Sequence, residues 1–114
     1  MKIEKDFKNW DGQNVWICDT NWNKRVIEPV EANLMASYNT AYFRKISKNG
    51  KVSKSVKWSY NSSGSWRRSS EMQVFDNEIE CKDYFVKACK ERINELTVNY
   101  NEDLKYLGDL IINT

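Results

Sequence analysis

Histidine is absent from this chain of 114 residues. Without it, the usual general base, the commonest metal ligand and the Ser-His-Asp and Cys-His nucleophilic arrangements are all missing. The three cysteines, Cys18, Cys81 and Cys89, form no CxxC pair and are odd in number. That pattern argues against both a disulfide framework and a zinc site. We therefore expect no metal, no cofactor and a reducing, cytoplasmic environment.

Catalytic chemistry has few candidates left. They are the neighbouring carboxylates of Glu78 and Glu80 and the thiol of Cys18. Acidic residues at the start of a helix are explained more simply by their attraction to the helix dipole, and no residue supplies a base with a tuned pKa. Long apolar runs and an apolar leader segment are also missing, so we expect no contact with a membrane. The sequence indicates a protein that is not an enzyme.

The clearest positive feature is the separation of charge along the chain. Residues 32–70 contain no acidic side chain but eight of the 18 Lys and Arg, so ten cationic and 16 acidic side chains remain for the flanks, a net charge of −6 there. Six aromatic residues lie in the same stretch, namely Tyr38, Tyr42, Phe43, Trp58, Tyr60 and Trp66. Alternating cations and aromatic rings are what phosphate chains and exposed bases bind.

The length allows one domain, 1–114, which we divide into a β module at 1–75 and a helical segment at 76–114. Short β-rich runs predict strands at 15–18, 24–35 and 72–75, and Pro29 places the second of these at an edge or a bulge because proline lacks an N–H. We expect an α+β fold: an antiparallel meander, or a partly open SH3-like barrel, of about five strands before a long helix.

Asn49-Gly50 between two alternating runs predicts a hairpin with a type I′ turn. In that register Phe43 faces Val56, Tyr42 faces Lys57 and Ala41 faces Trp58, while Lys48 opposes Lys51 and Lys45 opposes Lys54. One face is then apolar, with Ala41, Phe43, Val56, Trp58 and Tyr60. The other carries Tyr42, Arg44, Ser53, Ser55, Lys57 and Ser59.

Two readings of this hairpin are open. The functional one makes Tyr42, beside Arg44 and opposite Lys57, a stacking surface for bases, and uses the nearby Trp66-Arg67-Arg68 as a clamp. The structural one has the lysines protecting a sheet edge from other chains, with Trp66 in the core. The predicted binding residues are Tyr42, Arg44, Lys45, Lys48, Lys51, Lys54, Lys57, Trp66, Arg67 and Arg68.

From Asn77 the apolar period becomes helical, and Asn77-x-x-Glu80 is a capping box. Weak helix formers at 97–101 leave two possibilities: a fold-back near Asn99 to Asn101, or an unbroken helix about twice as long as the β module is wide, which would need a partner. The second possibility predicts a homodimer. Its packing residues are Ile93, Leu96, Tyr100, Leu104, Leu107 and Ile111.

The segment VFDNEIEC at 74–81 resembles the strand-to-helix junction of small phage and prophage proteins, with Cys81 where that pattern has alanine. The Asn- and Lys-rich composition resembles that of genes from mobile elements. This resemblance implies a non-catalytic accessory role of the anti-defence, anti-CRISPR kind, in which a small protein inhibits a host nuclease or grips nucleic acid.

Two functional hypotheses follow. The first is a binding protein whose basic aromatic hairpin engages nucleic acid or a nucleic-acid-handling host complex. The second is a protein-binding inhibitor or adaptor that uses an acidic helix face and touches no nucleic acid. That face comprises Glu78, Glu80, Asp83, Glu91, Glu95, Glu102 and Asp103.

Overall fold

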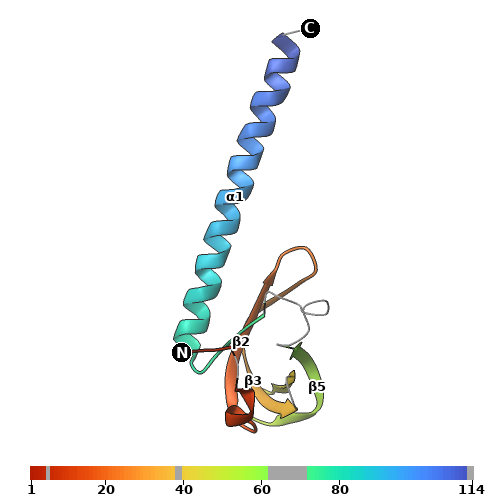
Figure 1. Ribbon diagram of the computed structural model, residues 1–114, viewed down its shortest axis with the longest axis vertical. Coiled ribbons are helices and arrows are strands. Elements are labelled where there is room, and N and C mark those ends of the chain that lie inside the picture. Colours follow the sequence, from red (N-terminus) through yellow and green to blue (C-terminus); the bar gives the residue numbers. More distant parts are fainter. Residues whose placement is uncertain (5, 38–39, 62–71, 113–114) are drawn as a thin grey trace.

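The computed structural model, which describes residues 1–4, 6–37, 40–61 and 72–112, is an open antiparallel sheet followed by one long helix (Figure 1). The α+β expectation is confirmed. The elements are β1 (Lys2–Ile3), the 3-10 helix η1 (Phe7–Trp10), β2 (Asn14–Asn21), β3 (Arg25–Ser37), β4 (Thr40–Ile46), β5 (Val52–Asn61), β6 (Met72–Phe75) and α1 (Glu78–Ile112).

Among the described residues, the sheet has six strands in the order β1-β6-β2-β3-β4-β5. Strands β2 to β5 form the expected meander, and β6 returns to the other side of β2, where Trp16 faces Phe75. The sheet does not close, because β1 and β5 are its two edges. The expected number of about five strands is one too low, since the two-residue strand β1 adds to β6.

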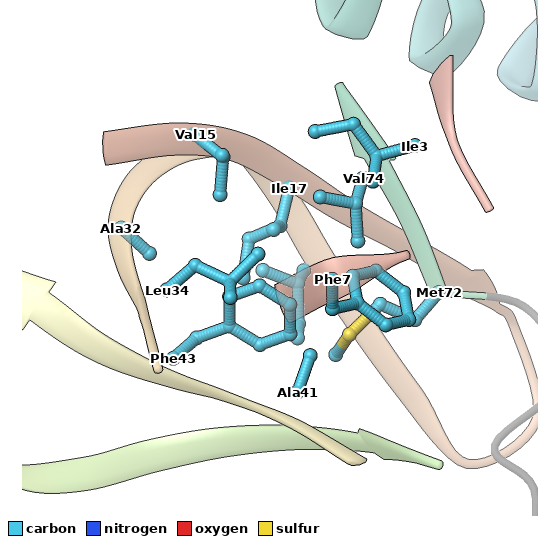
Figure 2. Close-up of a cluster of buried hydrophobic side chains, with 11 residues drawn as sticks. Ile3, Phe7, Val15, Ile17, Ala32, Leu34, Ala41, Phe43, Met72 and Val74 are labelled. Atoms are coloured by element: carbon cyan, nitrogen blue, oxygen red, sulfur yellow. The ribbon is translucent and has the colours of Figure 1, made fainter. Parts of the chain in front are cut away.

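The main core lies on one face of the sheet (Figure 2). Val15 and Ile17 of β2, Leu34 of β3 and Phe43 of β4 are fully buried there. Phe7 of η1 packs into this cluster and meets the ring of Tyr60, with the ring centroids 5.7 Å apart. The alternation of apolar and polar residues along the strands therefore predicts the core. No periodic pattern in the sequence predicts η1.

A smaller cluster on the opposite face anchors the helix. It joins Cys18 of β2, Phe75 of β6 and Cys81 of α1, with Tyr84 and Phe85 packed against them. The neighbouring sulfur of Cys18 and the burial of the site both raise the pKa of the Cys81 thiol. Cys81 therefore stays a neutral thiol that packs as a small apolar side chain.

Pro29 lies at a bulge, as predicted. Ile17 faces Val30 and Asp19 faces Ile27, so two residues of β3 oppose one residue of β2. Strand β3 pairs with β4 only from Ala32 onward, which leaves residues 25–31 without a ladder partner on that side. Proline is tolerated here because no ladder hydrogen bond is lost.

The helix is continuous from Glu78 to Ile112, so the predicted fold-back near Asn99 to Asn101 is wrong. Its start is capped as expected, with the Asn77 side-chain oxygen accepting the Glu80 N–H at 2.9 Å. Within residues 97–101, which are weak helix formers, the Thr97 hydroxyl donates a hydrogen bond to the Ile93 carbonyl at 2.8 Å. A helical backbone accommodates such a bond.

The helix reaches far beyond the sheet (Figure 1). Its 35 residues span about 52 Å, and the radius of gyration is 18.8 Å, against about 13 Å for a compact chain of this length. Within the described ranges, none of the helices combines the length and apolarity that a membrane crossing requires. The elongated shape exposes most of α1 to solvent.

The turn between β2 and β3 is tied by a buried carboxylate. Asp19 accepts hydrogen bonds from Arg25 Nε at 3.1 Å and Nη2 at 2.8 Å, and from the Asn21 N–H at 3.0 Å. Asp19→Ala should lower the free energy of unfolding by about 2–3 kcal/mol, since it leaves these donors unpaired. Urea denaturation measures the loss. The matched control Asp83→Ala, at an exposed helix position, should stay within about 0.5 kcal/mol of wild type. Equal losses in the two variants would contradict this role.

Candidate site on the β4–β5 hairpin

The hairpin predicted at Asn49-Gly50 is present, but its turn is of another type. Gly50 has a φ of 80°, whereas Asp6 is the non-glycine residue with positive φ among those described, so Asn49 does not adopt the type I′ conformation. The Ser47 N–H donates to the Lys51 carbonyl and the Gly50 N–H to the Ser47 carbonyl, both at 2.9 Å. These bonds define a three-residue loop ending in a left-handed glycine.

This loop and two irregularities in the ladder change the register. Phe43 faces Trp58, Tyr42 faces Ser59 and Arg44 faces Val56, so the predicted partners of Tyr42 and Phe43 are wrong by two residues. At the tip, Ile46 faces Val52, and Lys45 lies opposite the three residues 53–55 rather than Lys54 alone. Lys48 and Lys51 are not a directly opposed pair either, because Ser47 occupies the position bonded to Lys51.

The apolar face of the hairpin is largely as predicted. Ala41 and Phe43 are buried, and Trp58 and Tyr60 pack against the main core, but Val56 is 42% exposed. Tyr42 is half-buried on the other face of β4. It lies beside Met35 and Ser59 in the ladder and not opposite Lys57, so the expected stacking surface of Tyr42 and Lys57 is not assembled.

Arg44 is held by the sheet. Its Nη2 donates to Asn33 Oδ1 at 2.6 Å, and the Asn33 amide in turn donates to the Gly12 carbonyl at 2.9 Å and to Asn14 Oδ1 at 3.0 Å. The Arg44 Nε is buried and has no hydrogen-bond partner in the part of the chain that the structure describes. Arg44 therefore links β4 to β3 and the Gly12 turn, and its guanidinium is only partly available to a ligand.

The lysines gather elsewhere, around a groove at the open side of β3. Lys45 and Lys57 line it together with Trp58 and residues 26–30, and its volume is about 670 Å³. The Lys57 ammonium lies 5.1 Å from the centre of the Trp58 ring, a cation–π distance. The groove forms where β3 runs past the last residue of β4, so residues distant in sequence share it.

A second hollow of about 470 Å³ lies at the hairpin tip and shares Lys45 with the groove. Lys48, Lys51 and Val52 are among its other lining residues. We call the two hollows together the lysine groove. Lys45, Lys48, Lys51, Lys54 and Lys57 are all exposed, and none of them belongs to an ion pair among the described residues.

Sequence reasoning missed the contribution of β3 to this site. Val26, Pro29 and Val30 form part of the groove wall, with Glu28 as its acidic member. The available signal was Pro29, which indicated an interrupted ladder but not which strand would come to lie beside it. Trp66, Arg67 and Arg68 lie outside the described residues.

The described residues contain no cluster of three His, Cys, Asp or Glu side chains suited to a metal ion. The six helix residues predicted for dimer packing are all exposed on α1. No protein-family model, curated protein or solved structure matches the chain.

The turn geometry gives a prediction that separates the two turn types. Gly50→Ala should cost about 1 kcal/mol of unfolding free energy, because an L side chain is strained at this positive φ. Asn49→Ala should change stability by less than about 0.5 kcal/mol, since Asn49 needs no such conformation. Thermal unfolding of both variants provides the measurement. A comparable loss for Asn49→Ala would indicate the type I′ turn instead.

Proposed function

We propose that this protein is a non-catalytic binding protein whose lysine groove holds single-stranded nucleic acid. The observation that carries the proposal is the placement of four exposed lysines, Lys45, Lys48, Lys51 and Lys57, around two hollows that share Lys45. None of the four belongs to an ion pair among the described residues, and Lys54 lies outside both linings. Lysines that served only solubility would not need to be gathered around a hollow. Unpaired ammonium groups in a concave surface attract a polyanion.

The residues that line the groove favour a nucleic acid over a simple polyphosphate as its ligand. Trp58 offers a partly exposed ring, and Val26, Pro29 and Val52 add apolar wall around it. An unpaired base can rest on such a wall while the lysines contact phosphates, and each stacked base contributes about 1–3 kcal/mol. A double helix keeps its bases inside, so this apolar wall favours a single strand.

The distribution of charge over the molecule supports the same function. The helix α1 carries eight acidic and five cationic side chains, whereas the hairpin is purely cationic. A polyanion approaching the protein would be repelled by the helix and attracted by the groove. A net charge of only +2 therefore does not argue against binding, because the local field and not the total orients the encounter.

The hypothesis of an acidic helix surface has less support. Three of its carboxylates already have cationic partners: Glu78 pairs with Lys82, Glu80 with the terminal ammonium of Met1, and Glu95 with Arg92.

The resemblance to phage accessory proteins extends the main proposal to nucleic acid that is bound within a host nuclease complex. In that setting the groove would compete for, or grip, the nucleic acid on which the nuclease acts.

The test compares two triple variants with the same loss of charge. Lys45→Gln, Lys48→Gln and Lys51→Gln together remove the groove cations, and Lys87→Gln, Lys90→Gln and Lys105→Gln together remove three helix cations. We expect the first set to lower affinity for a fluorescent oligothymidylate at least tenfold and the second to leave it nearly unchanged. Fluorescence anisotropy between about 50 and 200 mM salt gives the affinities and their salt dependence.

The salt dependence identifies the mechanism. Loss of three phosphate contacts should reduce the slope of log affinity against log salt by about 2, since each contact contributes about 0.7 for a single strand. Equal slopes for both triple variants would mean that binding is non-specific and would refute the groove. No binding by the wild-type protein at low salt would also refute it and would favour a protein partner.

A further inference from the structure

The helix α1 carries an exposed apolar stripe along nearly its whole length. Seven large side chains of the stripe are between 50% and 76% exposed. With the half-buried Cys89, they recur at spacings of three and four, and we call this set the helix stripe: Val86, Cys89, Ile93, Leu96, Tyr100, Leu104, Leu107 and Ile111. Such a repeat over nearly four heptads is typical of helices that pack side by side.

The stripe is distinct from the face that holds the helix to the sheet. Cys81, Tyr84 and Phe85 pack against β2 and β6. At about 100° per residue, the helix stripe lies roughly a third of a turn around the axis from these residues. The sheet of the same chain therefore leaves this face largely uncovered, although Cys89 is half-buried.

The order of the stripe has a symmetry that a helix packing on an unrelated surface would not need. Counted from Tyr100, the other members of the stripe except Val86 lie at four, seven and eleven residues in both directions. The pairs related in this way are Leu96 with Leu104, Ile93 with Leu107, and Cys89 with Ile111. A two-fold axis through Tyr100, perpendicular to the helix, superimposes the pattern on itself.

We propose that the helix stripe binds a second copy of this chain, and that the two α1 helices run antiparallel around a two-fold axis at Tyr100. In this arrangement each pair named above forms one layer of the interface, with Tyr100 against its own copy at the centre. A two-fold interface requires such a self-complementary surface. The seven steps of the stripe cover 25 residues, about 3.6 per turn, so the helices pack without marked supercoiling.

Charge favours the antiparallel direction. Residues 86–99 carry three cationic and two acidic side chains, and residues 101–112 carry one cationic and three acidic ones. Antiparallel helices place the positive half of one copy beside the negative half of the other, and they also oppose the helix dipoles. A parallel pair would bring halves of like charge together.

The size of the stripe suits a stable dimer. Covering its seven exposed side chains and the aliphatic stems beside them would remove on the order of 700 Å² per copy from water, close to the ~800 Å² per partner of a stable interface. The same contact explains how the distal half of α1 stays helical. Helices gain most of their stability from packing, and the sheet of this chain does not reach that half (Figure 1).

The first test uses sedimentation equilibrium and a matched pair of variants. We expect a wild-type dimer at micromolar concentration, and Leu96→Glu should raise its dissociation constant at least 100-fold. Val98→Glu introduces the same charge at a similarly exposed apolar residue on the opposite side of the helix, and it should remain dimeric. Circular dichroism and an urea unfolding curve show whether each variant keeps its folded sheet. A monomeric wild-type protein, or equal effects of the two variants, would overturn the proposal.

The second test determines direction. Leu96→Cys and Leu104→Cys are prepared as separate proteins, mixed and oxidised. Mass spectrometry of the disulfide-linked peptides after cleavage at glutamate then identifies which positions are joined, native cysteines included. The antiparallel arrangement gives mainly the mixed dimer linked from position 96 to position 104. Dimers linked between identical positions, or a dimeric sample without the mixed product, would overturn the antiparallel arrangement. Neither test involves the lysine groove, so failure of one proposal leaves the other intact.

Discussion

Burial of β2 on both of its faces is the constraint on which the rest of the structure depends. Val15 and Ile17 point into the main core, while Trp16 and Cys18 face the start of α1. Because β2 is covered on both sides, it fixes the position of the helix relative to the sheet. Because Cys18 meets Cys81 directly, the direction in which α1 leaves the sheet is set within its first two turns. Ala88, Glu91, Arg92 and Glu95 still lie beside the β2–β3 turn, and most of the helix beyond them is exposed and available for other contacts.

Two exposed surfaces among the described residues are consequently not used by the chain's own folding. The lysine groove lies at the β4–β5 hairpin and the neighbouring part of β3, and the helix stripe lies along α1. The first is cationic and concave, and the second is apolar and linear. Neither surface stabilises the folded chain by itself. Unpaired lysines repel one another, and leucines that stay exposed to water contribute no hydrophobic free energy. A dimer through the stripe would present two grooves, and a single strand that reached both would be held more tightly than by one groove.

Local patterns were sufficient for the main strands and for the start of the helix, and insufficient for the site. Asn77 capped the helix as the sequence indicated, and Pro29 marked a bulge, because each depends on a few neighbouring residues. The predicted register of the hairpin was wrong because the pair Asn49-Gly50 is compatible with two types of turn. In the turn that forms, Gly50 has a positive φ and Asn49 does not. Arg44 was assigned to a binding surface, but Asn33, eleven positions earlier, accepts its hydrogen bond across the sheet.

The sequence by itself determined the α+β order of elements, the charge-separated hairpin and helix, and the periodic stripe on α1, since alternation, helical period and charge are written into consecutive residues. Only the tertiary structure decided that β3 runs past β4, that its residues 26–30 meet Lys45, Lys57 and Trp58, and that α1 continues unbroken into solvent. The physical reason is that bulges and strand ends are settled by how several strands pack over one core. That packing depends on contacts between residues far apart in the chain, which no local pattern contains.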